Sequence, residues 1–108
     1  MDTIRYFKLT NKGGFVARIH VSYRRDGEEN WKEWSGSGDI CLHAEKTQDL
    51  SAVGIEDGTR VRLIAFVAGG IDKLANEEYI FSASASKTAS YKITGTTLIS
   101  TLSLEGCS

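Results

Sequence analysis

The sequence predicts an all-β protein, folded as an antiparallel β-sandwich of eight or nine short strands with Greek-key-like connections. Apolar and polar residues alternate along most of the chain, and turn residues recur at intervals of roughly 8–12 residues. No stretch keeps an apolar period of about 3.6 residues over two helical turns. The 108 residues are 41% hydrophobic and 25% charged, which fits a globular protein with one core. We therefore expect a single β-sandwich domain over residues 1–108.

The first two predicted strands lie on either side of a glycine turn. Residues 4–11 and residues 15–23 both alternate between apolar and polar side chains. Between them, Gly13 and Gly14 tolerate the positive φ of a tight turn. The pattern therefore predicts an antiparallel hairpin with one buried and one solvent-facing side. The outward side chains of this hairpin are Tyr6, Lys8, Arg18 and His20.

The middle of the chain contains shorter predicted elements and one long strand. The long strand covers residues 59–68 and is apolar on both faces near its end, which indicates a central position in its sheet. Turn residues at 56–58 precede it. The shorter elements are strands at 31–35, 39–43 and 47–50, and a single helical turn within 51–55.

The last third of the chain continues the strand pattern. Strands are predicted at 78–83, 88–94 and 97–105, and a helical turn at Leu74–Ala75. In the last strand, Leu98, Leu102 and Leu104 are expected on one face. Long connections at 45–58 and 69–76 suit crossovers between two sheets, which favours a sandwich over the alternative, a barrel.

Charge is distributed in two blocks along the first half of the chain. Six basic residues and no acid lie between Asp2 and Asp26, whereas nine acids and two lysines follow from Asp26 to Asp57. The blocks either form a two-signed surface that attracts an anionic partner or another copy, or they lie side by side and form ion pairs. The net charge of −1 gives no reason to expect a nucleic-acid partner.

The residues that often carry catalysis or bind metals are sparse. Cys41 and Cys107 lie far apart, and His20 and His43 do not supply the short spacing of a metal site. We expect two free thiols, Cys41 buried in a strand and Cys107 on a frayed tail, with a disulfide as the alternative. We expect no cofactor and no metal, although carboxylate pairs at turns leave calcium as an alternative. His20 is expected on the surface, and no catalytic motif is present. The protein is therefore predicted not to be an enzyme, although a catalytic cleft invisible in sequence remains an alternative.

Aromatic residues provide the candidate binding surface. Trp31 and Trp34 are three positions apart in a polar segment, so they cannot share one face of a strand. At least one is expected at the surface, where tryptophan suits membrane interfaces and sugar rings; the alternative is that one closes an end of the sandwich. The predicted binding residues are Tyr6, Lys8, Arg18, His20, Trp31 and Trp34. This cationic aromatic set predicts anionic lipid headgroups or glycans as partners.

The general character of the chain resembles small β-sandwich proteins of the aegerolysin kind and other small membrane-active or insecticidal bacterial proteins. The features that carry this resemblance are the absence of proline, the strand Phe7-x-Leu9-x-Asn11 and the Ser/Thr-rich stretch 82–103. The dense tryptophan segment of aegerolysins is absent, so no binding residue is transferred. The resemblance implies a toxin-like, non-enzymatic protein that binds lipid or glycan. The alternative is a self-assembling protein that pairs through edge strands and complementary charge blocks as a homo-oligomer.

The opening of the chain gives an expectation about localisation. No basic-then-apolar signal segment follows Met1, and no apolar run reaches the roughly 20 residues of a membrane-spanning helix. We therefore expect a cytoplasmic or non-classically released protein.

Overall fold

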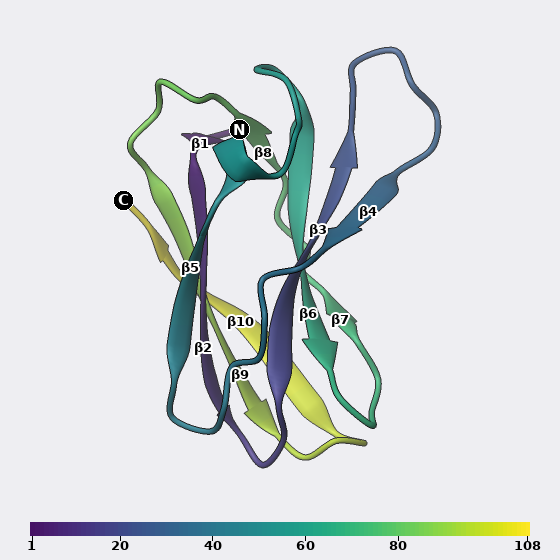
Figure 1. Ribbon diagram of the computed structural model, residues 1–108, viewed down its shortest axis with the longest axis vertical. Helices are drawn as coiled ribbons and strands as arrows, with labels where there is room; N and C mark the ends of the chain where they lie inside the picture. Colours follow the sequence, from purple (N-terminus) through teal and green to yellow (C-terminus); the bar gives the residue numbers. More distant parts are fainter.

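The computed structural model describes residues 1–108 and confirms an all-β sandwich of two facing sheets (Figure 1). The first sheet has the order β1 (Thr3–Ile4), β8 (Tyr79–Phe81), β6 (Arg60–Val67), β3 (Ala17–Arg24) and β4 (Lys32–Ser35), with β7 (Lys73–Leu74) paired to β6. The second has the order β10 (Ser100–Cys107), β9 (Thr88–Gly95), β2 (Tyr6–Gly13) and β5 (Glu45–Asp49). We call them sheet A and sheet B. The 3-10 turn η1 (Leu50–Ala52) is the only helical element, and no helix is long and apolar enough to cross a membrane.

Each sheet contains one parallel pair of strands among its antiparallel pairs. β2 runs parallel to β9 from Tyr6 beside Thr88 to Gly13 beside Gly95. β1 runs parallel to β8 in the same way over two residues. The first strands of the chain are therefore paired with strands near its other end, and both sheets are mixed.

The predicted hairpin between residues 4–11 and 15–23 is wrong, because β2 lies in sheet B and β3 in sheet A. The cause lies in the turn between them. The ring of Phe15 packs so closely on Gly13 that a side chain at that position would collide with it. Phe15 is itself buried between the sheets. The chain therefore passes from sheet B to sheet A at this point, and it does not reverse within one sheet.

The core lies between the sheets and follows the predicted alternation. It contains 19 buried hydrophobic residues, and the inward faces of β3 and β6 are those expected from the sequence. Phe7 of sheet B meets Tyr79 of sheet A edge-on, with ring centroids 5.8 Å apart. Each fully buried large side chain contributes roughly 1.5–3 kcal/mol, so this cluster is the main source of stability.

Three local predictions are corrected by the structure. The expected strand 39–43 is reduced to a bridge between Ile40 and Ala17, because Ala44 donates to the Cys41 carbonyl at 2.9 Å and closes a turn. The expected helical turn at Leu74 is instead strand β7, which pairs with Ile64. The cysteines are free thiols, and Cys41 is exposed rather than buried in a strand.

Candidate functional site

The predicted cationic patch is divided between two opposite surfaces. Tyr6 and Lys8 lie on β2 and face outward from sheet B. Arg18 and His20 lie on β3 and occupy the outer face of sheet A. Because the core separates the two sheets, these four side chains do not form one binding surface, and the prediction of a single patch is wrong.

The cations of this patch are also neutralised by the acidic block. Lys8 Nζ lies 3.2 Å from Glu45 Oε2, and Arg18 Nε lies 2.6 Å from Asp39 Oδ1. Two more pairs join the same two blocks: Arg5 with Asp49, and Arg25 with Glu56. Of the two interpretations of the charge blocks, ion pairing between them is the one found.

His20 is covered, although its strand position faces away from the core. The residue is only 8% exposed. Its Nδ1 lies 2.8 Å from Glu33 Oε2, and its ring stacks on Phe66 with centroids 4.9 Å apart. The neighbouring strands β4 and β6 supply these two covering residues. The prediction of a surface histidine is therefore wrong.

The two tryptophans lie on opposite sides of sheet A. Trp34 is the partner of Val21 in the β3–β4 pair and packs, half-buried, against the core. It closes the edge of the sandwich at β4, in line with the alternative considered for one tryptophan. Trp31 precedes β4 and lies under two guanidinium groups, with Arg62 Cζ 3.6 Å and Arg24 Cζ 5.3 Å from its ring centroid.

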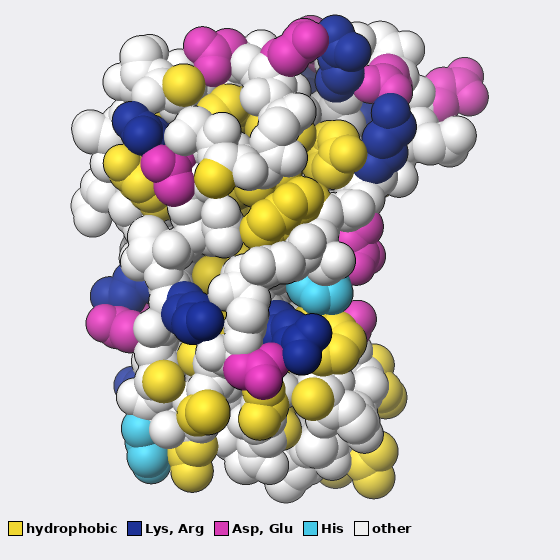
Figure 2. Space-filling model, viewed as in Figure 1, with side chains coloured by type: hydrophobic (Ala, Val, Ile, Leu, Met, Phe, Trp, Pro, Cys, Tyr) yellow, Lys and Arg dark blue, Asp and Glu magenta, His cyan; other side chains and the backbone are white.

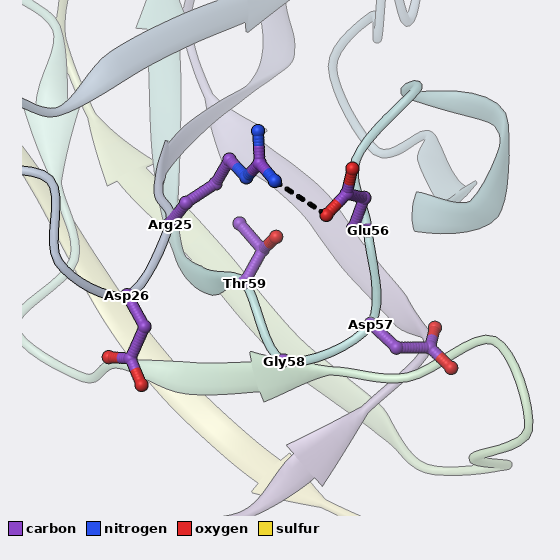
Figure 3. Close-up of a pocket in the computed structure, with 6 residues that line it drawn as sticks. All are labelled: Arg25, Asp26, Glu56, Asp57, Gly58 and Thr59. Carbon is purple, nitrogen blue, oxygen red and sulfur yellow. Dashed lines mark hydrogen bonds and ion pairs between the residues drawn. The ribbon is translucent and has the colours of Figure 1, made fainter.

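A polar hollow of about 270 Å³ opens at the end of the molecule near the N-terminus (Figure 3). Arg25 crosses it to Glu56 at 2.8 Å, and Asp57 accepts a hydrogen bond from the Ala83 amide at 2.9 Å. Asp26 points away from both of these acids (Figure 3). No group of three or more His, Cys, Asp or Glu is arranged to hold a metal ion. The hollow is therefore a polar depression whose carboxylates diverge.

The opposite end of the sandwich is apolar. Seven large hydrophobic residues are exposed, and five of them lie on or beside the loops at this end. These five residues, which we call the apolar end, are Leu42, Ile71, Leu74, Leu98 and Ile99. The most exposed are Leu98 at 71% and Ile99 at 78%. In Figure 2 the lower end of the visible face is yellow and white apart from a histidine, whereas charged side chains crowd the upper end.

The loops of the apolar end are tied to one another through their backbones. Ile71 donates its amide to the Thr97 carbonyl at 3.3 Å, and Gly70 passes so close to that carbonyl that a Cβ there would collide with it. Within the β9–β10 loop, Thr96 Oγ1 accepts from the Ile99 amide at 3.2 Å. The exposed aliphatic side chains are therefore presented by loops of fixed geometry.

Asn11 joins two further segments at the same end, the glycine turn and residues 40–43. Its side chain donates to the carbonyls of Phe15 at 2.6 Å and Ile40 at 2.9 Å, and it accepts from the Gly13 amide at 2.9 Å. Its backbone carbonyl accepts from the His43 amide at 2.7 Å. Asn11 is completely buried, and its side-chain oxygen and nitrogen both have partners. This residue fixes the glycine turn and the segment that carries Leu42.

Two lysines at this end have no acidic partner. Lys12, near the end of β2, and Lys73, at the start of β7, form no ion pair within 4 Å. Lys12 is exposed and Lys73 is half-buried. The apolar end is therefore bordered by two lysines without an ion-pair partner and by one exposed acid, Asp72, which accepts a hydrogen bond from the Val67 amide.

The sequence contained a signal for the apolar end that the strand pattern obscured. The alternation predicts Leu98 on one face with Leu102 and Leu104 in a strand starting at residue 97, but β10 starts at Ser100. Leu98 and Ile99 are adjacent large aliphatic residues directly after the turn at Gly95–Thr97. Only one of two neighbouring residues can face the core from a strand, so at least one of them had to face solvent.

Comparison with known proteins identifies the fold. No family model matches the chain, and no curated protein matches it. Three solved structures are similar, each with a TM-score of 0.50: the cytotoxin suilysin from Streptococcus suis at 18% identity, listeriolysin O at 17%, and a structure described as a trapped toxin at 20%.

These alignments cover 94% of this chain but only 22–23% of the other chains. The chain therefore spans about a quarter of the length of these proteins. Identities this low establish a shared fold alone. The chain thus shares its fold with part of these toxins, and the likeness to aegerolysins in particular stays a prediction.

Proposed function

We propose that the chain is a non-enzymatic binding module that attaches to a lipid bilayer through its apolar end. The observation that carries this proposal is the gathering of five exposed aliphatic residues on adjoining loops at one end of the sandwich. Large apolar patches on a protein surface mark sites of interaction with membranes or other molecules. A toxin-like role is supported by the shared fold with the solved toxins.

The chemistry of the patch favours a bilayer over a protein partner. All five residues are Leu or Ile, whereas protein interfaces favour Trp, Tyr and Arg at their centres. Lys12 and Lys73 beside the patch suit phosphate headgroups at the depth where the aliphatic side chains enter the bilayer. Transfer of these partly exposed side chains contributes roughly 5 kcal/mol in total, which supports reversible docking.

The placement of the histidines supports a non-enzymatic function. The Nδ1 atom of His20 is engaged by Glu33, and its ring is covered by Phe66. His43 lies in a turn at the apolar end, with its amide bonded to Asn11. In the polar hollow, Arg25 and Glu56 neutralise each other, so neither is positioned as a free acid or base.

The test is vesicle co-sedimentation of the double variant Leu98→Ser/Ile99→Ser. The vesicles are phosphatidylcholine alone or with phosphatidylserine. Each is prepared with and without cholesterol, because a sterol changes the packing of the headgroup layer. Loss of two aliphatic side chains is expected to weaken partitioning by about tenfold or more. Leu104→Ser is the matched control, since Leu104 is 39% exposed on β10, away from the loops.

The control is expected to bind within about twofold of the unmodified protein, because it leaves the apolar end intact. Thermal unfolding of both variants verifies that they fold. Binding of the double variant equal to that of the unmodified protein would contradict the proposal. So would failure of the unmodified protein to bind any of the vesicles.

Self-association through β10 is the second candidate function. β10 is an eight-residue edge strand with one charged residue, Glu105, whereas the edge strands β4 and β5 are rich in charge. An uncharged edge exposes backbone groups to which another strand can pair. Light scattering over a range of concentrations tests this, with Ser103→Lys placing a charge on the edge. A dimer that Ser103→Lys converts to a monomer supports it, and a monomer at every concentration contradicts it.

A further inference from the structure

Three arginines lie together on the outer face of sheet A, toward the end opposite the apolar end. Arg24 of β3 is the cross-strand partner of Arg60 on β6, and Arg62 lies two residues further along β6. All three face outward because the alternating residues Val61 and Leu63 are buried in the core. The sheet therefore sets three guanidinium groups side by side.

Most hydrogen-bond donors of these arginines are unused. Arg24 Nη1 donates to the Glu28 carbonyl at 2.7 Å, and Arg62 Nη2 donates to Ser22 Oγ at 3.1 Å. The Nε atoms of Arg24 and Arg62 are buried without a partner. Since each guanidinium carries five N–H donors, the cluster keeps a large capacity to bind an acceptor.

The acids on this face do not neutralise the cluster. Glu33 binds His20 at 2.8 Å, and the carboxylate of Glu28 lies 3.5 Å from Lys32. Glu78 is the only carboxylate that forms an ion pair with any of the three arginines, at 3.8 Å from Arg60, which is longer than a hydrogen bond. Three positive charges therefore face a single negative charge, that of Glu78.

Trp31 holds two of these like charges near each other. The guanidinium of Arg62 lies 3.6 Å from the ring centroid, and that of Arg24 lies 5.3 Å from it. Attraction between each cation and the negative face of the ring offsets part of the repulsion between the two arginines. Trp31 thus acts as a platform that positions the arginines.

We propose that Arg24, Arg60 and Arg62 form a binding site for a tetrahedral oxyanion, the sulfate or phosphate group of a glycan. The planar fork of a guanidinium matches two oxygens of such a group, and each contact is a charge-assisted hydrogen bond. The Nη donors that the chain leaves unused supply these contacts, since only one Nη of Arg24 and one of Arg62 is engaged.

The position of the site selects a glycan over a lipid headgroup, an argument that rests on the proposed function. Strand β3 runs from Ala17, near the apolar end, to Arg24. At about 3.3 Å per residue, the arginines lie roughly 20 Å from that end. With the apolar end in the bilayer, the site stands above the headgroup layer, within reach of a sugar chain that projects from the membrane.

The experiment is isothermal titration calorimetry with a sulfated heparin-derived tetrasaccharide. Its desulfated form, inorganic sulfate and phosphatidylserine vesicles are the comparison probes. Arg24→Gln/Arg62→Gln removes two charges of the site. Arg25→Gln/Lys87→Gln is the control, which removes two cations already paired with Glu56 and Asp2.

The unmodified protein and the control are expected to bind the sulfated tetrasaccharide. The site variant is expected to bind it about tenfold or more weakly, because it has lost charge-assisted hydrogen bonds. The desulfated form is expected not to bind. Arg60→Gln alone provides a second variant if the double variant does not fold. In a Trp34→Phe protein, Trp31 is the only tryptophan, and its fluorescence is expected to change on binding.

Equal weakening by the site variant and the control would overturn the proposal, because net charge alone would then explain binding. A protein that binds none of the probes would also overturn the proposal. Vesicle binding that is lost only in the site variant would overturn it as well, because the arginines would then bind lipid headgroups. Leu98→Ser/Ile99→Ser is expected to keep tetrasaccharide binding. Failure of the membrane proposal and failure of the glycan site are thus separate results.

Discussion

The two ends of the sandwich differ in whether their exposed side chains have partners within the chain. At the end near the N-terminus, charged loops are paired internally, as in Arg25 with Glu56 and Lys32 with Glu28. At the apolar end, Leu98 and Ile99 have no covering element and stay exposed. Charge can be cancelled by a partner elsewhere in the chain, whereas exposed aliphatic surface requires a partner outside it. The apolar end is therefore more informative about function than the charged end.

The largest effect is expected from Asn11→Ala, which would break the apolar end without altering any of its aliphatic residues. The substitution leaves the Phe15 carbonyl and the Gly13 amide without the partner that Asn11 supplies, and it leaves the Ile40 carbonyl with the Ala17 amide alone. Each unsatisfied group costs about 1–3 kcal/mol, so we expect a loss near 3 kcal/mol in urea unfolding. Vesicle binding should fall as well. A change below about 0.5 kcal/mol would show that the segments hold together without Asn11.

A smaller effect is expected from Tyr91→Phe, in the core between the two ends. Tyr91 Oη lies 2.8 Å from Tyr79 Oη and donates to Glu77 Oε1 at 3.0 Å. Loss of both contacts is expected to cost about 1–2 kcal/mol. Vesicle and glycan binding should stay unchanged, and a loss of either would mean that the two ends are coupled through the core.

The same pair predicts the response to alkali. Burial raises the pKa of Tyr91 and that of Tyr79 above the ordinary value. A raised folded-state pKa contributes stability that is present below the unfolded pKa of about 10 and is lost as the pH rises above it. Ultraviolet titration should show these two tyrosines ionising only as the protein unfolds. Ionisation of all four tyrosines in the folded state would contradict this.

A weaker effect is expected from Lys8→Glu/Arg18→Glu, which reverses two charges on opposite sheets. Both side chains are partly exposed and form ion pairs, with Glu45 and Asp39. Solvent screening limits such pairs, so we expect a combined loss of about 1 kcal/mol in thermal unfolding. Binding to phosphatidylserine vesicles should change little, because the apolar end is intact. A large loss of binding would indicate that Lys8 and Arg18 contact the membrane, as the sequence predicted.

The smallest effect is expected from Asp49→Asn, near the charged end. Hydrogen bonds from the Arg5 guanidinium hold the pKa of the Asp49 carboxyl well below its ordinary value, although desolvation opposes them. The contribution is present above the unfolded pKa of about 4 and is lost as the pH falls below it. At pH 7 the variant should be less stable by about 1 kcal/mol or less, since the pair is partly exposed. The urea midpoints of the two proteins should draw together as the pH falls from about 4 toward the folded-state pKa of Asp49, and a constant difference would contradict the assignment.

The sequence predicted what depends on near neighbours. Alternation over residues 15–23 and 59–68 identified the buried faces, because the orientation of side chains along a strand is a local property. The sequence could not predict that Lys8 and Arg18 lie in different sheets, because the sheet to which a strand belongs depends on partners far along the chain. Asn11 lies between these cases. Asn11 shares the spacing of Phe7 and Leu9, but only the fold shows that it is buried and which carbonyls it binds.

The parallel pairing of β2 with β9 has a consequence for the order of assembly. This pairing begins with Tyr6 beside Thr88, so the central strand pair of sheet B cannot form until β9 has been synthesised. Sheet A can form its β3–β6 pair earlier, because those strands need only the chain up to residue 67. A nascent chain on the ribosome can therefore pair β2 on one side only, with β5, until β9 has been synthesised. Such distant contacts make folding slow, on the order of milliseconds to seconds, and leave the first strand open to capture by a chaperone.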